Sequence, residues 1–201
     1  MKNNKRQKGF TLIELLVVIA IIAILAVVVV LTLNPAELLR QARDSNRISD
    51  FATLKSALAL YSTDVSTTTS MDGGTPLMLW SANPTVPVFG GVYSATTQGS
   101  WAFLGGETAI TTTTSRSVSG TGWIPVNLNA ISSGAPIGTY PVDPVNTGTS
   151  SAYVYAATAT TWKVATMMES VKYKTGGPND VETNDGGNSI YVYEQGSNLG
   201  L

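Results

Sequence analysis

The strongest pattern in the chain is a long run of apolar residues near the N-terminus. Residues 15–31 contain no polar side chain, and the apolar stretch from Phe10 to Leu33 is otherwise interrupted only by Thr11, Glu14 and Thr32. An α-helix rises about 1.5 Å per residue, so about 20 such residues cross a hydrocarbon core of about 30 Å. The pattern predicts a transmembrane helix over residues 10–33.

A second helical pattern covers residues 34–61. Asn34 and Pro35 are typical of a helix start, with Asn34 as N-cap, Pro35 at the first helical position and Glu37 placed to complete a capping box. In one continuous helix the same proline would instead cause a kink. Apolar residues then recur at three- and four-residue steps, which predicts an amphipathic helix packed against the rest of the chain. These residues are Leu38, Leu39, Ala42, Ile48, Phe51, Leu54, Leu58 and Tyr61.

Charged residues gather on the first half of this amphipathic helix. They are Arg40, Arg43, Asp44, Arg47 and Asp50. In a monomer these groups would be solvated, and in an assembly they would pair with neighbouring subunits.

Helical periodicity ends after Tyr61, where Ser, Thr and Gly dominate. The hydroxyl-rich tracts 62–70 and 111–121 are typical of loops or edge strands, and residues 86–93 and 101–104 resemble short strands. Two alternating runs within 152–169 predict a hairpin, with a third strand at 190–194. We expect an α+β fold, in which a small antiparallel sheet in a head of residues 62–201 packs on the amphipathic helix.

The distribution of charge sets the orientation in the membrane and limits the partners. Four basic residues, Lys2, Lys5, Arg6 and Lys8, precede the apolar run, which places the N-terminus in the cytoplasm and the head outside. Residues 62–201 carry four basic against nine acidic side chains. Because nucleic-acid binding needs concentrated Lys and Arg, this balance disfavours nucleic acid as a ligand.

The chain contains no cysteine and no histidine. Disulfides, thiolate metal sites and any Ser-His, Cys-His or His-metal chemistry are therefore impossible. A carboxylate hydrolase is disfavoured as well, because no paired acids fall in a convincing pocket context. We do not expect an enzyme.

The N-terminal segment fits neither of the two common membrane signals. A removable secretory signal has a shorter apolar region, and its cleavage site lies beyond that region. A plain anchor explains the length but not Glu14, because a carboxylate at membrane depth costs about 2.5–3.5 kcal/mol and rarely lacks a partner. Glu14 would avoid this cost only by reaching the interface or by pairing with another group.

The residues from Lys8 to Ala26, a basic leader, Gly9, Phe10 and an apolar helix with Glu14, resemble the class III signal of type IV prepilins and pseudopilins. The resemblance implies that a membrane prepilin peptidase cuts after Gly9 and methylates the new N-terminal Phe10. It also implies that Glu14 pairs with the N-terminal amine of a neighbouring subunit in a helical filament. Residues 1–9 would then be a cleaved leader, and the helix is expected to melt near Pro35 in the filament.

The tail carries a second, weaker resemblance. Pro141–Asn146, the Tyr-rich hairpin, Met168–Ser170, Asp185–Gly187 and Tyr193–Gly196 are similar to the head of major pseudopilins of type II secretion systems. Related pseudopilins bind calcium in a C-terminal loop, and oxygen-bearing residues alternate here at Asp180, Glu182, Asn184 and Asp185. The spacing does not match an EF-hand, because the glycine comes one place late and Tyr191 occupies the twelfth position. The alternative is a solvated acidic turn.

These patterns, taken with the two resemblances, imply a structural subunit of a type IV pilus-like or type II secretion pseudopilus filament. Its expected partners are copies of itself, prepilin peptidase and the inner-membrane assembly machinery. It would span the inner membrane once before assembly and then lie in a periplasmic or cell-surface filament. The alternative is a membrane-tethered binding or adhesive module, which would need neither Gly9 nor Glu14.

Overall fold

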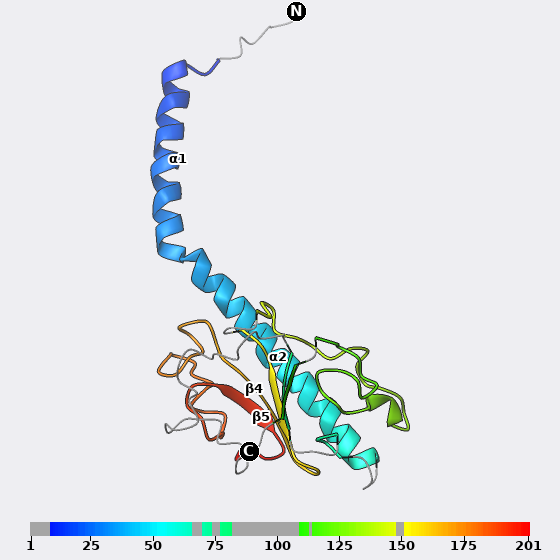
Figure 1. Cartoon of the computed structure of the whole chain (residues 1–201). Helices are drawn as coiled ribbons and strands as arrows, with labels where there is room; N and C mark the ends of the chain where they lie inside the picture. The colour runs from blue at the N-terminus through cyan, green and yellow to red at the C-terminus, as the bar shows by residue number, and fades with distance from the viewer. Residues whose placement is uncertain (1–8, 66–69, 74–76, 82–108, 113, 148–150) are drawn as a thin grey trace, which may run out of the picture. The chain divides into compact units, whose positions relative to one another are not determined.

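The computed structural model describes residues 9–65, 70–73, 77–81, 109–112, 114–147 and 151–201 (Figure 1). The helices are α1 (Leu12–Leu33), α2 (Pro35–Asp64) and the short 3-10 helix η2 (Leu128–Ala130). The strands are β1 (Leu77–Trp80), β2 (Ala109–Thr112), β3 (Val154–Ala157), β4 (Trp162–Thr166) and β5 (Tyr193–Gly196). The chain divides into two compact units, one ending at Leu39 and the other beginning at Arg40.

The helix is interrupted at Asn34, between α1 and α2. Asn34 is the C-cap of α1 and adopts the left-handed conformation, with φ 42° and ψ 69°. Asn34 also directly precedes Pro35, the first residue of α2, although it is not in the extended conformation usual for an N-cap, so its capping role for α2 stays a prediction. The backbone amides of Glu37 and Leu38 donate to the Asn34 carbonyl oxygen, at 3.0 and 3.3 Å. The predicted helix start at Pro35 is confirmed.

The buried stripe of α2 begins later than the sequence pattern indicates. Phe51, Leu54, Leu58 and Tyr61 are buried in the core, as predicted. The three predicted members that come first in the sequence, Leu38, Leu39 and Ala42, are exposed. Leu38 and Leu39 belong to the N-terminal unit, so they are not part of the head's core.

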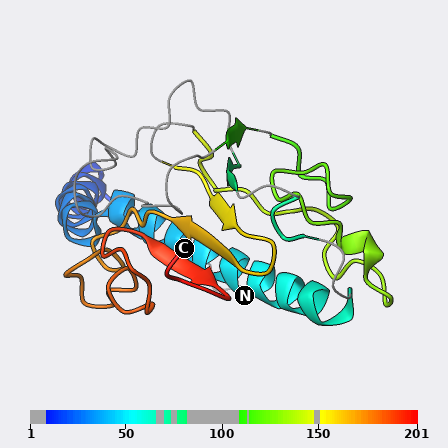
Figure 2. The same cartoon turned by 60° about the horizontal axis from the view of Figure 1, so that its bottom comes forward.

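The predicted hairpin of residues 152–169 is confirmed as β3 and β4, which pair antiparallel with Tyr155 opposite Val164. β5 pairs antiparallel with β4 and completes a three-stranded antiparallel sheet beside α2 (Figure 2). The predicted strand at 190–194 is displaced, because β5 starts at Tyr193. Ile190 and Tyr191 instead lie exposed in the preceding loop.

Two further strands extend the sheet beyond the hairpin, in the order β2-β1-β3-β4-β5. β1 pairs antiparallel with β3 and parallel with β2, so the sheet as a whole is mixed. β2 lies within and just before the hydroxyl-rich tract 111–121 and forms one edge, in agreement with the expected loop or edge strand. The strands predicted at 86–93 and 101–104 lie outside the described residues.

The two faces of the hairpin carry different side chains. Tyr153, Tyr155, Trp162 and Val164 point to one face and join the hydrophobic core that includes α2. Phe51 of α2 packs edge-on against Tyr153, with ring centroids 5.0 Å apart. Because side chains alternate along a strand, Lys163 points to the opposite face, and every residue of β3 and β4 is nevertheless buried.

Candidate functional site

The N-terminal end of α1 is closed by a capping box between Thr11 and Glu14. The Thr11 hydroxyl accepts from the Glu14 amide at 3.3 Å, and Glu14 Oε2 accepts from the Thr11 amide at 2.9 Å. The Thr11 hydroxyl also donates to Glu14 Oε2, at 2.7 Å. This arrangement satisfies two amides that a helix start otherwise leaves without intrahelical partners. The spacing Thr-x-x-Glu is a sequence signal for such a box, which was not among the expected features of this segment.

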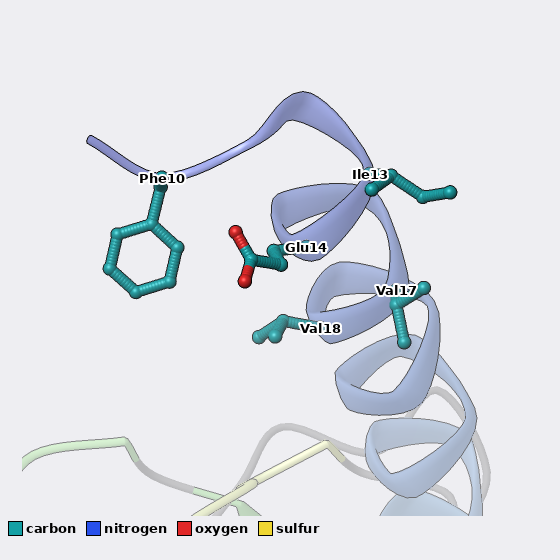
Figure 3. A pocket seen from close by; sticks show the side chains of 5 residues that line it. All are labelled: Phe10, Ile13, Glu14, Val17 and Val18. Atoms are coloured by element: carbon teal, nitrogen blue, oxygen red, sulfur yellow. The ribbon is translucent and has the colours of Figure 1, made fainter. Parts of the chain in front are cut away.

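The Glu14 carboxylate lies within an otherwise apolar hollow on the first turns of α1. Phe10, Ile13, Val17 and Val18 line the hollow together with Glu14. Figure 3 shows the carboxylate beside the Phe10 and Val18 side chains. Phe10 is 87% exposed, so the hollow is open at its N-terminal end. A single anionic group in apolar surroundings is suited to receive one cationic group.

Gly9 and Phe10 precede the helix and are exposed. α1 begins only at Leu12, and among the described residues, apart from Gly9 and its neighbours in the chain, no atom lies within 4 Å of the position that a Cβ on Gly9 would occupy. The peptide bond between Gly9 and Phe10 is thus outside regular structure. An exposed peptide bond outside a helix or strand is accessible to a protease.

The remainder of α1 is an exposed apolar surface. Within the described part of the chain, one helix is long and apolar enough to cross a membrane, over Leu12–Val30. At about 1.5 Å per residue, its 19 residues extend about 28 Å, close to the thickness of a hydrocarbon core. So large an apolar surface requires lipid or protein partners.

These features coincide with a known sequence family. Residues 4–30 match the model of the prokaryotic N-terminal methylation motif. The N-terminus is a type IV pilin-like class III signal. Signals of this kind are substrates of prepilin peptidase, and they are typical of structural proteins rather than of enzymes. They fit a protein that is anchored in the inner membrane by its N-terminal helix. No curated protein and no solved structure was found to match the chain.

Charged residues of α2 form a cluster with charged residues of the head. The sequence patterns did not predict this cluster. Arg47 is fully buried, and its guanidinium donates to Asp143 at 2.7 and 3.0 Å, to Asp44 at 2.7 Å and to Glu169 at 2.5 Å. Arg43 also donates to Glu169, with a shortest distance of 2.5 Å. We call these five residues the charge clamp.

The charge clamp corrects the expectation that these groups are solvated or paired with neighbouring subunits. Asp44 is fully buried and accepts from the backbone amides of Glu169 and Ser170, at 2.7 to 3.1 Å. Burial alone would raise the pKa of Glu169, but hydrogen bonds from Arg43 and Arg47 hold it below its usual value. A buried charge is tolerated only with such partners, and the fork of Arg donors can serve several carboxylates at once.

The other two residues of the predicted charged group, Arg40 and Asp50, behave differently. Arg40 is exposed, whereas Asp50 accepts a hydrogen bond from the Tyr153 hydroxyl at 2.6 Å. The motifs that carry the weaker resemblance therefore supply partners for α2, because Asp143, Tyr153 and Glu169 all belong to them.

The four residues predicted to bind calcium, Asp180, Glu182, Asn184 and Asp185, each form hydrogen bonds with different backbone groups. Asp180 accepts from the amides of Gly176 and Thr183, and Glu182 accepts from those of Met168 and Thr175. The Asn184 side-chain amide donates to the Asp180 carbonyl at 2.8 Å. Among the described residues, no three acidic side chains converge as a metal site. Calcium binding there stays a prediction.

Proposed function

We propose that the chain is a structural subunit of a type IV pilus-like or type II secretion pseudopilus filament. Prepilin peptidase cuts it after Gly9 and methylates Phe10, and the inner-membrane assembly machinery then packs the mature chains through α1. Before assembly the chain spans the inner membrane once with its leader in the cytoplasm. Afterwards it lies in a periplasmic or cell-surface filament.

The observation that carries this proposal is the position of Glu14. Its carboxylate lies at the first turn of an apolar, exposed helix and beside Phe10, the residue whose amine cleavage would free. A carboxylate at membrane depth costs about 2.5–3.5 kcal/mol, and a cationic amine from a neighbouring chain offsets that cost. Because the pairing occurs only at one axial offset, it sets the register of neighbouring subunits.

The capping box requires a control that separates two roles of Glu14. Glu14→Gln removes the negative charge, whereas Thr11→Val removes the hydroxyl partner and leaves the carboxylate. If Glu14 acts in assembly, filaments are lost with Glu14→Gln and persist with Thr11→Val. If Glu14 only caps α1, Glu14→Gln keeps its filaments, because the Gln side-chain oxygen still accepts from the Thr11 amide, and Thr11→Val, which removes the other half of the cap, loses them.

The experiment measures the intact mass and the N-terminal residue of chains recovered from sheared filaments and from membranes. The proposal predicts a mature wild-type chain that starts at methylated Phe10 in the filament fraction, and a Glu14→Gln chain that is cut but stays in the membrane. An uncut wild-type chain whose location does not depend on Glu14 would contradict the proposal. That result would indicate a membrane-tethered binding module instead.

A further inference from the structure

Lys163 is a buried lysine on the face of the sheet opposite α2. It is the second residue of β4, and its side chain is 1% exposed. A lysine is almost never fully buried unless its ammonium group is paired. Its position predicts a dedicated set of oxygen partners.

The ammonium group of Lys163 is surrounded by oxygen atoms of the C-terminal segment. Glu194 Oε1 lies 2.8 Å from Lys163 Nζ, and the Glu194 carboxylate is also buried. Lys163 Nζ donates to Asn188 Oδ1 at 3.2 Å, to the Leu199 backbone oxygen at 3.3 Å and to the backbone oxygen of Leu201. We call these four partners the oxygen cage. The members of the oxygen cage come from a short part of the chain, between Asn188 and Leu201.

The loop before β5 is built around the Glu194 carboxylate and a second carboxylate, that of Asp185. Glu194 Oε2 accepts from the Ser189 amide at 3.2 Å, and Asp185 accepts from the amides of Gly187 and Glu194 at 2.7 and 2.5 Å. A Cβ on Gly187 would lie 1.8 Å from Glu194 Oε2, so the backbone passes directly over the carboxylate. The loop conformation therefore depends on where the Glu194 carboxylate is held.

An oxygen cage of one carboxylate, one amide and two backbone oxygens is the kind of environment that binds a cation. We propose that the oxygen cage is a cation-binding site occupied by the chain's own Lys163. The lysine ammonium group takes the place of a metal ion and holds residues 185–201 in their folded conformation. When the lysine side chain is removed, the site accepts a free primary alkylammonium cation. This inference does not rest on filament assembly.

The test uses the full chain in detergent micelles and hydrogen exchange of residues 185–201 as the readout. Lys163→Ala removes Cγ, Cδ, Cε and Nζ, which are the heavy atoms of n-propylammonium. Breaking a buried pair leaves Glu194 without its counter-charge, so we expect exchange in 185–201 to be at least about a hundredfold faster in this variant. Added n-propylammonium restores slow exchange, and 1-propanol, which lacks the charge, does not.

The matched control is Lys55→Ala. Lys55 is an exposed lysine of α2 that donates to Gln195 of β5, the residue after Glu194, at 2.9 Å, so this variant removes the same four side-chain atoms and also breaks a contact with β5. Exchange in 185–201 should change less than about threefold in the control, because an exposed contact contributes little. Equal effects of Lys55→Ala and Lys163→Ala would overturn the proposal.

The wild-type chain supplies a second test. If Lys163 closes the loop, EDTA and added calcium leave exchange in 185–201 unchanged, whereas calcium binding at Asp180, Glu182, Asn184 and Asp185 would make it slower with calcium. Slowing by calcium, or faster exchange with EDTA, contradicts the proposal. So does a Lys163→Ala chain that n-propylammonium fails to restore.

If Lys163→Ala fails to fold, Glu194→Gln tests the same ion pair by changing the carboxylate instead of the lysine. This substitution keeps the shape of the side chain and removes its charge. We expect faster exchange confined to 185–201, with exchange in the buried part of α2 around Phe51 and Leu54 unchanged. Unchanged exchange in Glu194→Gln overturns the proposal.

Discussion

The Arg47 guanidinium of α2 binds the Asp143 carboxylate through two hydrogen bonds, of 2.7 and 3.0 Å, and both side chains are fully buried. Ninety-six positions separate the two residues in the sequence. The pair is therefore a long-range connection between the helix and the loop that precedes the hairpin. Buried ion pairs of this kind contribute less to stability than their geometry suggests, but breaking one is costly.

We predict that Arg47→Ala lowers the free energy of unfolding of the head by about 3–5 kcal/mol, because Asp44 and Asp143 lose their buried counter-charge. Urea unfolding followed by tryptophan fluorescence measures the loss. Arg40→Ala is the control, since Arg40 is exposed on the same helix and its removal should cost less than about 0.5 kcal/mol. Equal losses in the two variants would mean that the charge clamp does not anchor α2.

Tyr153→Phe tests the second connection between α2 and the hairpin. The variant removes the hydroxyl that donates to Asp50 and leaves a half-buried carboxylate without this donor. We expect a loss of about 1–3 kcal/mol in the free energy of unfolding. Asp50→Asn keeps an acceptor for the hydroxyl and should lose less. A Tyr153→Phe chain as stable as the wild type would contradict the prediction.

The pH dependence of stability should carry a contribution from Asp185. Burial raises the pKa of Asp185 to about 6, with a smaller contribution from the nearby Glu194. In the unfolded chain an aspartate has a pKa of about 3.9, so the folded state takes up the proton first as the pH falls. This group therefore stabilises the fold progressively as the pH falls from about 7 to about 4.

The measurement is the free energy of unfolding of the wild type and of Asp185→Asn between about pH 7 and about pH 4, because the difference isolates Asp185 from other acids. The wild type should gain stability relative to the variant on acidification. A carboxyl carbon titration by NMR gives the pKa directly. A wild type that loses stability relative to Asp185→Asn over this range would show that the pKa is not raised.

Gly187→Ala should destabilise the loop around Glu194. The new methyl group would lie 1.8 Å from Glu194 Oε2, so either the backbone or the carboxylate must move. Overpacking of this kind costs about 1–3 kcal/mol. Gly138→Ala is a matched control because no atom lies within 4 Å of its Cβ position. Thermal unfolding of the two variants should differ by several degrees, and equal midpoints would contradict the close approach.

Local patterns were sufficient to predict the elements of this fold but not its polar connections. Periodicity identified α1, the core residues Phe51, Leu54, Leu58 and Tyr61, and the hairpin of β3 and β4. These features depend on neighbours within a few positions. The boundary of β5 was wrong by three residues, because the position of the loop before it is set by Asp185 and Glu194 rather than by strand propensity.

The burial of Asp44 and Arg47 was beyond the reach of such patterns. Charged residues on a helix are expected to be solvated unless their partners are known. Here the partners Asp143 and Glu169 lie about a hundred or more positions from α2 in the sequence. Lys163 is similar, since a lysine in an alternating strand is normally an exposed residue. For the N-terminal site the motif identified Gly9, Phe10 and Glu14, but the Thr11 partner of Glu14 was missed although its spacing was visible.

The capping box at Thr11 has a consequence for the energetics of subunit docking. In the filament that we propose, the carboxylate offered to a neighbouring amine already accepts two hydrogen bonds from its own chain. Docking is then an exchange reaction, whose driving force is the difference between the incoming ionic bond and the internal bonds that weaken. The internal bonds lower the cost of the carboxylate in the isolated subunit, and they lower the net gain of each docking step by the same amount.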